Sequence, residues 1–143
     1  MTKEMFEALS DTTEHMSNPQ LNIFLTQLLG NPISKYGDDV YAYYAPIEGA
    51  DVIVPNCAGN LESIWNVATS RTAILNYRRQ WQLNTRTRIE LLPWPSKNGV
   101  APTTVRFWEY VWFGRHADTA ARAFTLAYID YVLYRTRFPE LWK

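Results

Sequence analysis

The residue types that most often carry catalysis are scarce in this chain. It has one cysteine, Cys57, and two histidines, His15 and His116, which lie far apart in the sequence. A protein zinc site normally needs three or four clustered cysteine, histidine or carboxylate ligands, and no such spacing occurs here. We therefore expect no catalytic residues, no cofactor and no bound metal.

Two local patterns nevertheless keep a small enzyme open as an alternative. In Arg115-His116-Ala117-Asp118 a carboxylate can orient the imidazole of His116, although Asp118 is more simply a helix N-cap. Cys57 precedes a predicted helix, where the pKa of a thiol can be lowered, but a lone cysteine is usually a small buried apolar residue. This alternative is an enzyme that uses His116 or Cys57.

Arginine is the dominant cation, with ten of the 14 basic residues. Its planar guanidinium binds phosphate and carboxylate groups bidentately. The candidates for anion binding, interleaved with aromatic residues that can stack on bases, are Arg71, Arg78, Arg79, Arg86 and Arg88. A nucleic-acid-binding domain usually has an isoelectric point above about 9, whereas the value here is 6.7. RNA binding, as in a ribosomal subunit, or binding of anionic lipid headgroups is therefore an alternative.

Aromatic residues make up 15% of the chain and include six tryptophans. Tryptophan, tyrosine and arginine are enriched at the centres of protein interfaces. The interface candidates are Trp81, Trp94, Arg106, Trp108, Trp112, Arg115 and Trp142. The other interpretation is that the rings fill an aromatic-rich core.

The zero net charge hides a strong asymmetry between the two halves of the chain. Residues 1–62 carry two basic against nine acidic residues, a net of −7, and residues 63–143 carry twelve basic against five acidic residues, a net of +7. Such asymmetry favours an anionic partner for the second half. The alternative is that the acidic half and the basic, Arg- and Trp-rich half pack together and neutralise each other within a single domain, 1–143.

The tripeptide Leu133-Tyr134-Arg135 resembles the motif of the LYR family of small mitochondrial accessory and assembly proteins. In that family the tripeptide lies early in the first helix of a three-helix bundle, whereas here it ends the last predicted helix. The resemblance covers three residues, and the family is not assigned.

Hydrophobic periodicity predicts helices over Thr2–Met16, from an N-cap at Asn18 to Gly30, from a cap at Asn60 to about Leu83, and from Thr119 to about Phe138. The last of these is apolar nearly all round, as expected for a helix with neighbours on several sides. It contains Asp130, for which we expect an ion pair with Arg135 or Arg78, since a buried carboxylate is usually paired.

Strand signals are shorter. Val40–Tyr44 and Val52–Val54 predict a hairpin, or else extended segments over helices, and the alternation in Thr85–Glu90 predicts another strand. Residues 103–113 alternate like a strand that Gly114 ends, although a helix remains open. The predicted fold class is α+β, mainly helical, with about four helices and a small sheet or extended arms.

The function that these observations favour is a non-catalytic accessory or structural subunit of a large intracellular multiprotein complex. The single cysteine excludes an intrachain disulfide, and no signal or transit peptide is visible. The longest nearly uncharged stretch, 123–134, is shorter than the roughly 20 residues of a transmembrane span. The composition is similar to that of accessory subunits of mitochondrial respiratory or ATP synthase complexes, and a virion or phage structural protein would share it. We expect a soluble protein whose partners are other protein subunits.

Overall fold

A computed structural model of the chain describes residues 3–37, 40–45, 49–69, 88–93, 103–108 and 113–137. Within these residues the fold is mainly helical α+β, which confirms the predicted class. The helices are α1 (Lys3–Glu14), α2 (Asn18–Leu28), a short 3-10 helix η1 (Cys57–Gly59), α3 (Leu61–Thr69) and α4 (Ala120–Arg137). The strands are β1 (Ile33–Gly37), β2 (Val40–Ala45), β3 (Ala50–Ile53), β4 (Arg88–Pro93), β5 (Thr103–Trp108) and β6 (Phe113–Ala117).

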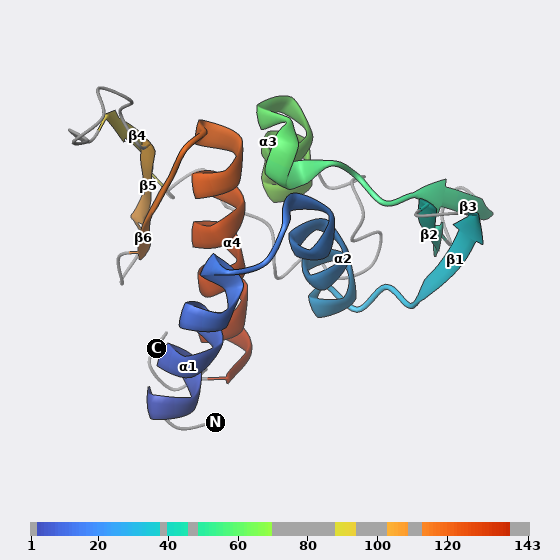
Figure 1. Ribbon diagram of the computed structural model, residues 1–143, viewed down its shortest axis with the longest axis horizontal. Coiled ribbons are helices and arrows are strands. Elements are labelled where there is room, and N and C mark those ends of the chain that lie inside the picture. The colour runs from blue at the N-terminus through green and yellow to red at the C-terminus, as the bar shows by residue number, and fades with distance from the viewer. Residues whose placement is uncertain are drawn as a thin grey trace.

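Helix α4 forms the centre of the molecule. Strands β4–β6 lie on one side of it, and α2 and α3 lie on the other (Figure 1). Every residue from Ala123 to Leu133 is buried, as the nearly uniform apolar sequence predicts. The rings of Phe124, Tyr128 and Tyr131 are among the largest fully buried side chains, so part of the aromatic content does fill the core.

The N-cap of helix α2 lies one residue before the cap that the sequence predicts. Ser17, rather than Asn18, is the N-cap: its hydroxyl accepts a hydrogen bond from the Gln20 amide, while the Gln20 side chain accepts one from the Ser17 amide. This reciprocal capping box satisfies two amides that the helix cannot pair. At the other end Gly30 has a φ of 92°, a left-handed conformation that glycine adopts without strain.

The sequence also predicts the caps of α3 and α4, and one of these two predictions is confirmed. Asn60 caps α3 as predicted, because its side chain accepts a hydrogen bond from the Ser63 amide. For α4 the prediction of Asp118 is wrong: the Thr119 hydroxyl accepts from the Arg122 amide, so Thr119 is the cap. The sequence predicts that helix α3 continues to about Leu83, but residues 70–87 lie outside the described residues.

The first sheet has the order β1-β2-β3, with both pairs antiparallel. It confirms the predicted hairpin, now β2–β3, and adds β1, which the sequence does not predict. These three strands extend from the helices to one side (Figure 1), and we call them the arm.

The second sheet, β4-β5-β6, is also antiparallel. The strand reading of residues 103–113 is correct for β5, but the run does not end at Gly114, since β6 continues to Ala117. Phe107 pairs with Phe113, so the chain reverses between them. Residues that pair across two antiparallel strands lie on the same face of the sheet. The apolar alternation of the sequence therefore runs from β5 into β6 without a break, although it belongs to two strands. The strand predicted at Thr85–Glu90 is observed from Arg88 to Pro93.

No helix in the described parts of the chain is long and apolar enough to span a membrane.

Candidate functional site

Most of the arginines and tryptophans singled out by the sequence fall where little or nothing is described. Arg88 lies in β4, and Arg106 and Trp108 lie in β5, with Arg88 opposite Trp108 in the register. The candidates that lie outside the described residues are Arg71, Arg78, Arg79, Trp81, Arg86, Trp94, Trp112 and Trp142. Anion binding and the tryptophan interface therefore remain predictions.

Arg115 is an exception, because its side chain is in the interior and not on an exposed interface. Only 6% of it is exposed, and its Nη1 lies 2.9 and 3.0 Å from the two carboxylate oxygens of Asp130. Its Nη2 donates to the hydroxyl of Thr13 at 3.3 Å. The predicted ion pair of Asp130 therefore exists, but its partner is Arg115 instead of Arg135 or Arg78. Strand β6 packs against α4, and this contact brings Arg115 to Asp130 although the two residues are distant in the sequence.

Arg122 joins the start of α4 to the end of α1. Its guanidinium donates to the carbonyl oxygens of Glu14 and Met16 at 3.0 and 2.7 Å, and to the Asn18 side chain at 2.8 Å. A cation at a helix C-terminus is stabilised by the helix dipole. Arg115 also approaches the carboxylate of Glu14, at 3.4 Å. Both arginines of the basic half thus contact the acidic half, where Arg115 meets the charged Glu14 carboxylate and Arg122 meets neutral acceptors.

Cys57 does not have the character of a nucleophile. Its side chain is 1% exposed, and burial raises the pKa of the thiol to about 12. With this pKa the thiol is protonated at neutral pH. Because the thiolate is the reactive form of cysteine, the protonated side chain is a poor nucleophile. Its place before α3 therefore does not lower the pKa, because desolvation outweighs any effect of the helix terminus.

His116 lies on β6 opposite Thr104, with an exposed side chain. Among the described residues, no three histidine, cysteine, aspartate or glutamate side chains are grouped so that they could hold a metal ion.

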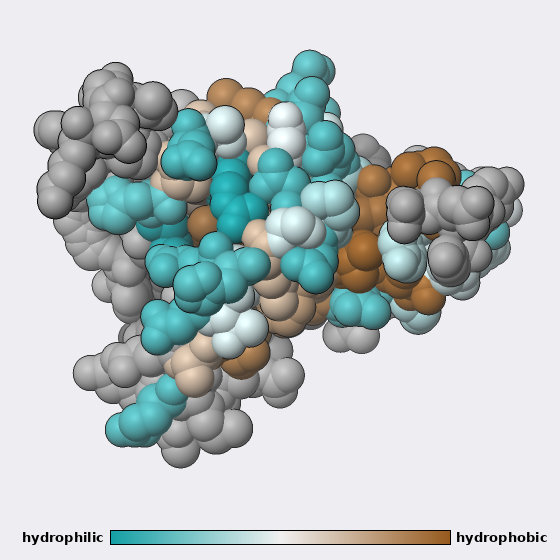
Figure 2. Space-filling view, viewed as in Figure 1, coloured by the Kyte–Doolittle hydropathy of each residue, from teal (hydrophilic) through white to brown (hydrophobic). Residues whose placement is uncertain are grey.

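The most distinctive surface of the described structure is an apolar face of the arm. Tyr44 and Ile53 are each 54% exposed and Val40 is 39% exposed. Val40 and Tyr44 lie on the same face of β2 as Ala42, whose partner is Ile53, so the three exposed side chains share that face, while Ala42 between them is buried. On the opposite face, Tyr43 belongs to the core. Figure 2 shows hydrophobic residues gathered over the arm and its junction with the helices.

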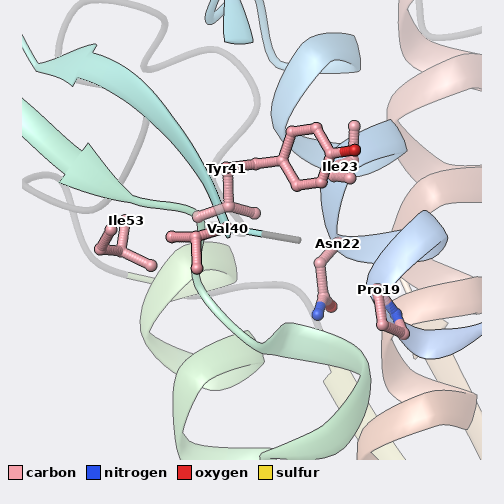
Figure 3. Close-up of a pocket in the computed structure, with 7 residues that line it drawn as sticks. Pro19, Asn22, Ile23, Val40, Tyr41 and Ile53 are labelled. Carbon is pink, nitrogen blue, oxygen red and sulfur yellow. The ribbon is translucent and has the colours of Figure 1, made fainter. Parts of the chain in front are cut away.

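A cleft of about 170 Å³ lies where this face meets α2. Its lining is formed by Pro19, Asn22, Ile23, Val40, Tyr41, Ile53 and Val54. Figure 3 shows Pro19 and Asn22 facing it from α2, and Val40 and Ile53 from the arm.

The cleft offers mainly apolar surface. Asn22 is its one amide, and both polar atoms of that side chain are used elsewhere: the nitrogen donates to Asn56 at 2.9 Å, and the oxygen accepts from the Ala58 amide at 2.8 Å. Pockets for cofactors and other small molecules usually have about 300–1,000 Å³, whereas an apolar cavity of about 150 Å³ holds a benzene ring. The cleft therefore has the size of one aromatic or branched aliphatic side chain.

One feature of the sequence does indicate this apolar face, although the tryptophans are the more obvious interface candidates. Val40–Tyr44 reads Val-Tyr-Ala-Tyr-Tyr and lacks the polar alternation of a strand with one solvated face. Whichever face packs inward, the other is apolar. What could not be read from the sequence is the cleft, because α2 and β2 meet only in the folded molecule.

Exposed apolar residues also lie on α3, where Trp65 is 48% exposed and its ring contacts Phe124 edge-on at 6.1 Å between centroids. Leu61, one turn earlier, is 39% exposed. The buried residues of α3 are Ile64, Val67 and Ala68.

Comparisons of the chain with protein-family models, with curated proteins and with solved structures find no match.

Proposed function

We propose that this protein is a non-catalytic accessory subunit of a multiprotein complex and that the arm is the surface through which it binds another protein. The observation that carries the proposal is the exposure of Val40, Tyr44 and Ile53 on one face of a projecting sheet, beside an apolar cleft. Contiguous exposed apolar surface on a small protein usually marks an interaction site.

The chemistry of the site also favours binding over catalysis. Among the described residues that line the cleft there is no histidine, cysteine or carboxylate, so these residues supply no general acid, base or nucleophile other than the Tyr41 hydroxyl. Interfaces obtain most of their affinity from a few anchor side chains in well-packed pockets, and the cleft has the volume for one such anchor.

The mitochondrial respiratory or ATP synthase complexes remain the assemblies that the composition suggests. The aromatic and arginine-rich composition of the chain is similar to that of accessory subunits of those complexes, and the arm supplies a surface by which the chain would attach. The assembly itself is a proposal that rests on composition.

The test is the size of the particle that contains the protein in a gentle extract of its own cells. We expect the wild type to elute from a size-exclusion column far above the 16.6 kDa of the chain. Tyr44→Ser combined with Ile53→Ser should move the protein to the monomer position. Gln27→Ser, at an exposed position of α2 that does not line the cleft, is the matched control and should leave elution unchanged. Elution of the wild type as a monomer would refute the proposal.

A further inference from the structure

We infer that residues 3–16, which we call the strap, open and close as a unit while the rest of the molecule stays folded, and that the Arg122 side chain holds the strap closed. The strap consists of α1 and the connection to α2, and α1 packs beside α4 (Figure 1). The inference goes beyond the proposed function and does not rest on it, because it concerns α1 and α4 and not the arm.

The boundary between the strap and the rest of the molecule lies at Ser17. Reciprocal hydrogen bonds between Ser17 and Gln20 cap the start of α2, so this helix end needs no contact from α1. The end of α1 is closed within the strap, where the Met16 amide donates to the carbonyl oxygen of Thr13 at 3.2 Å. The hydrogen bonds at the boundary are thus local on both sides, and separating the two helices here breaks neither set.

Helix α1 depends on contacts with the rest of the molecule. It has 12 residues, and isolated helices shorter than about 12–15 residues are marginal in water. Among its described side chains, Leu9 is only partly buried against the core, and the fully buried Thr13 is polar and accepts a hydrogen bond from Arg115 at 3.3 Å. Loss of these contacts should therefore unfold α1, so the opening of the strap is an order–disorder transition.

Arg122 spans the boundary between the strap and α2. On the strap its guanidinium donates to the carbonyl oxygens of Glu14 and Met16 at 3.0 and 2.7 Å. On α2 it donates to the side chain of Asn18 at 2.8 Å. When the strap opens, the first two of these acceptors leave, and the guanidinium becomes available to another molecule.

The position of Arg122 is unfavourable for α4 itself. Thr119 is the N-cap of α4, so Arg122 lies in the first turn of that helix, where the helix dipole opposes a cation. The last turn of α1 contains no basic residue of its own, and Arg122 places a cation at that end, where the dipole favours one. The electrostatic benefit of Arg122 therefore goes to the strap, and its removal should open the strap without unfolding α4.

The test is hydrogen–deuterium exchange of the full-length protein, measured by mass spectrometry. In the wild type we expect the amides of residues 3–14 to exchange at least about tenfold faster than those of residues 123–133 in the centre of α4. Arg122→Gln should accelerate exchange of residues 3–14 at least about tenfold further, as expected for the loss of a charge-assisted hydrogen bond. Residues 18–28 and 123–133 should stay within about twofold of the wild type.

Two further variants are the controls. Glu14→Gln keeps the carbonyl oxygen that Arg122 contacts and removes a carboxylate that is 55% exposed, so it should change the exchange of residues 3–14 by less than about threefold. Glu62→Gln removes an exposed charge in the first turn of α3, outside the strap, and should have no effect on these residues.

Equal protection of residues 3–14 and 123–133 in the wild type would overturn the inference. This comparison needs no variant, so it decides the matter even if Arg122→Gln fails to fold. In Arg122→Gln, an equal acceleration of α1, α2 and α4 would show that the strap is not a separate unit, and unchanged exchange of α1 would show that Arg122 does not hold it closed.

Discussion

At the scale of single residues, the chain uses its charged groups to connect elements. Arg115 of β6 meets Asp130 of α4 and Thr13 of α1, so three segments from different parts of the chain converge on one guanidinium. A buried ion pair contributes little net stability compared with a well-packed apolar pair, yet removing one partner is costly because the other charge remains buried.

The first prediction follows from that asymmetry. Asp130→Asn should lower the free energy of unfolding by about 3–5 kcal/mol, measured by urea denaturation. Asp11→Asn, an exposed carboxylate on α1, should change it by less than about 0.5 kcal/mol. The double variant Arg115→Met with Asp130→Leu removes both charges and should lose less than Asp130→Asn alone. If Asp130→Asn is as mild as Asp11→Asn, the pair does not have this role.

A second prediction concerns Cys57 and pH. The unfolded thiol has a pKa of about 8.5, whereas burial raises the pKa of the folded thiol to about 12. The unfolded state therefore loses its proton first, so the contribution to stability is complete below about pH 8.5 and decreases as the pH rises toward about 12, at about 1.4 kcal/mol per pH unit. Between about pH 8 and pH 10 the wild type should lose about 2 kcal/mol more than Cys57→Ala in urea denaturation. Parallel losses in the two proteins would show that the thiol does not stay protonated.

At the scale of elements, the sequence predicted well which segments form helices and predicted their caps less well. The cap Asn60 was predicted correctly. The two other predicted caps, Asn18 and Asp118, are each one residue away from the observed caps, Ser17 and Thr119. Adjacent Ser, Thr, Asn and Asp residues are all acceptable caps, so propensity alone does not choose between neighbours. At α2 a tertiary contact bears on the choice, because the side chain of Asn18 accepts a hydrogen bond from Arg122.

The capping box gives the third prediction. Ser17→Ala removes the acceptor for the Gln20 amide and should lower the free energy of unfolding by about 1 kcal/mol. Ser17→Asp keeps an acceptor at the same place and should recover most of that loss. Thermal denaturation monitored by circular dichroism measures both, and equal values for the two variants would contradict the role of the Ser17 hydroxyl.

Two neighbouring residues of β2 in the arm differ in burial, so we expect one to stabilise the fold and the other to be available for binding. Tyr43 is buried in the core and Tyr44 is 54% exposed, because consecutive residues of β2 point to opposite faces. As the fourth prediction, Tyr43→Ala should lower the free energy of unfolding by about 3–5 kcal/mol, while Tyr44→Ala should change it by less than about 0.5 kcal/mol. Comparable losses in urea denaturation would mean that the Tyr44 face contributes to the fold and is not a reserved surface.

At the scale of the whole molecule, the opposite charges of the two halves are partly used within the chain. Arg115 and Arg122 contact α1 and the start of α2, which joins the basic half to the acidic half around α4. The sequence allowed this interpretation, since it depends only on the distribution of charge. The candidate site could not be predicted from composition, which indicated the tryptophans as interface residues. The cleft is formed where α2 meets the arm, and this contact exists only in the folded chain.

The most direct test of the central claim, that the arm is covered by another protein in the cell, is photo-crosslinking at single positions in living cells. A photo-reactive amino acid is placed at position 44 on the arm or at position 27, an exposed site on α2 outside the cleft. We predict one crosslinked product of discrete mass from position 44 and none from position 27. No product from position 44, or the same products from both positions, would contradict the claim.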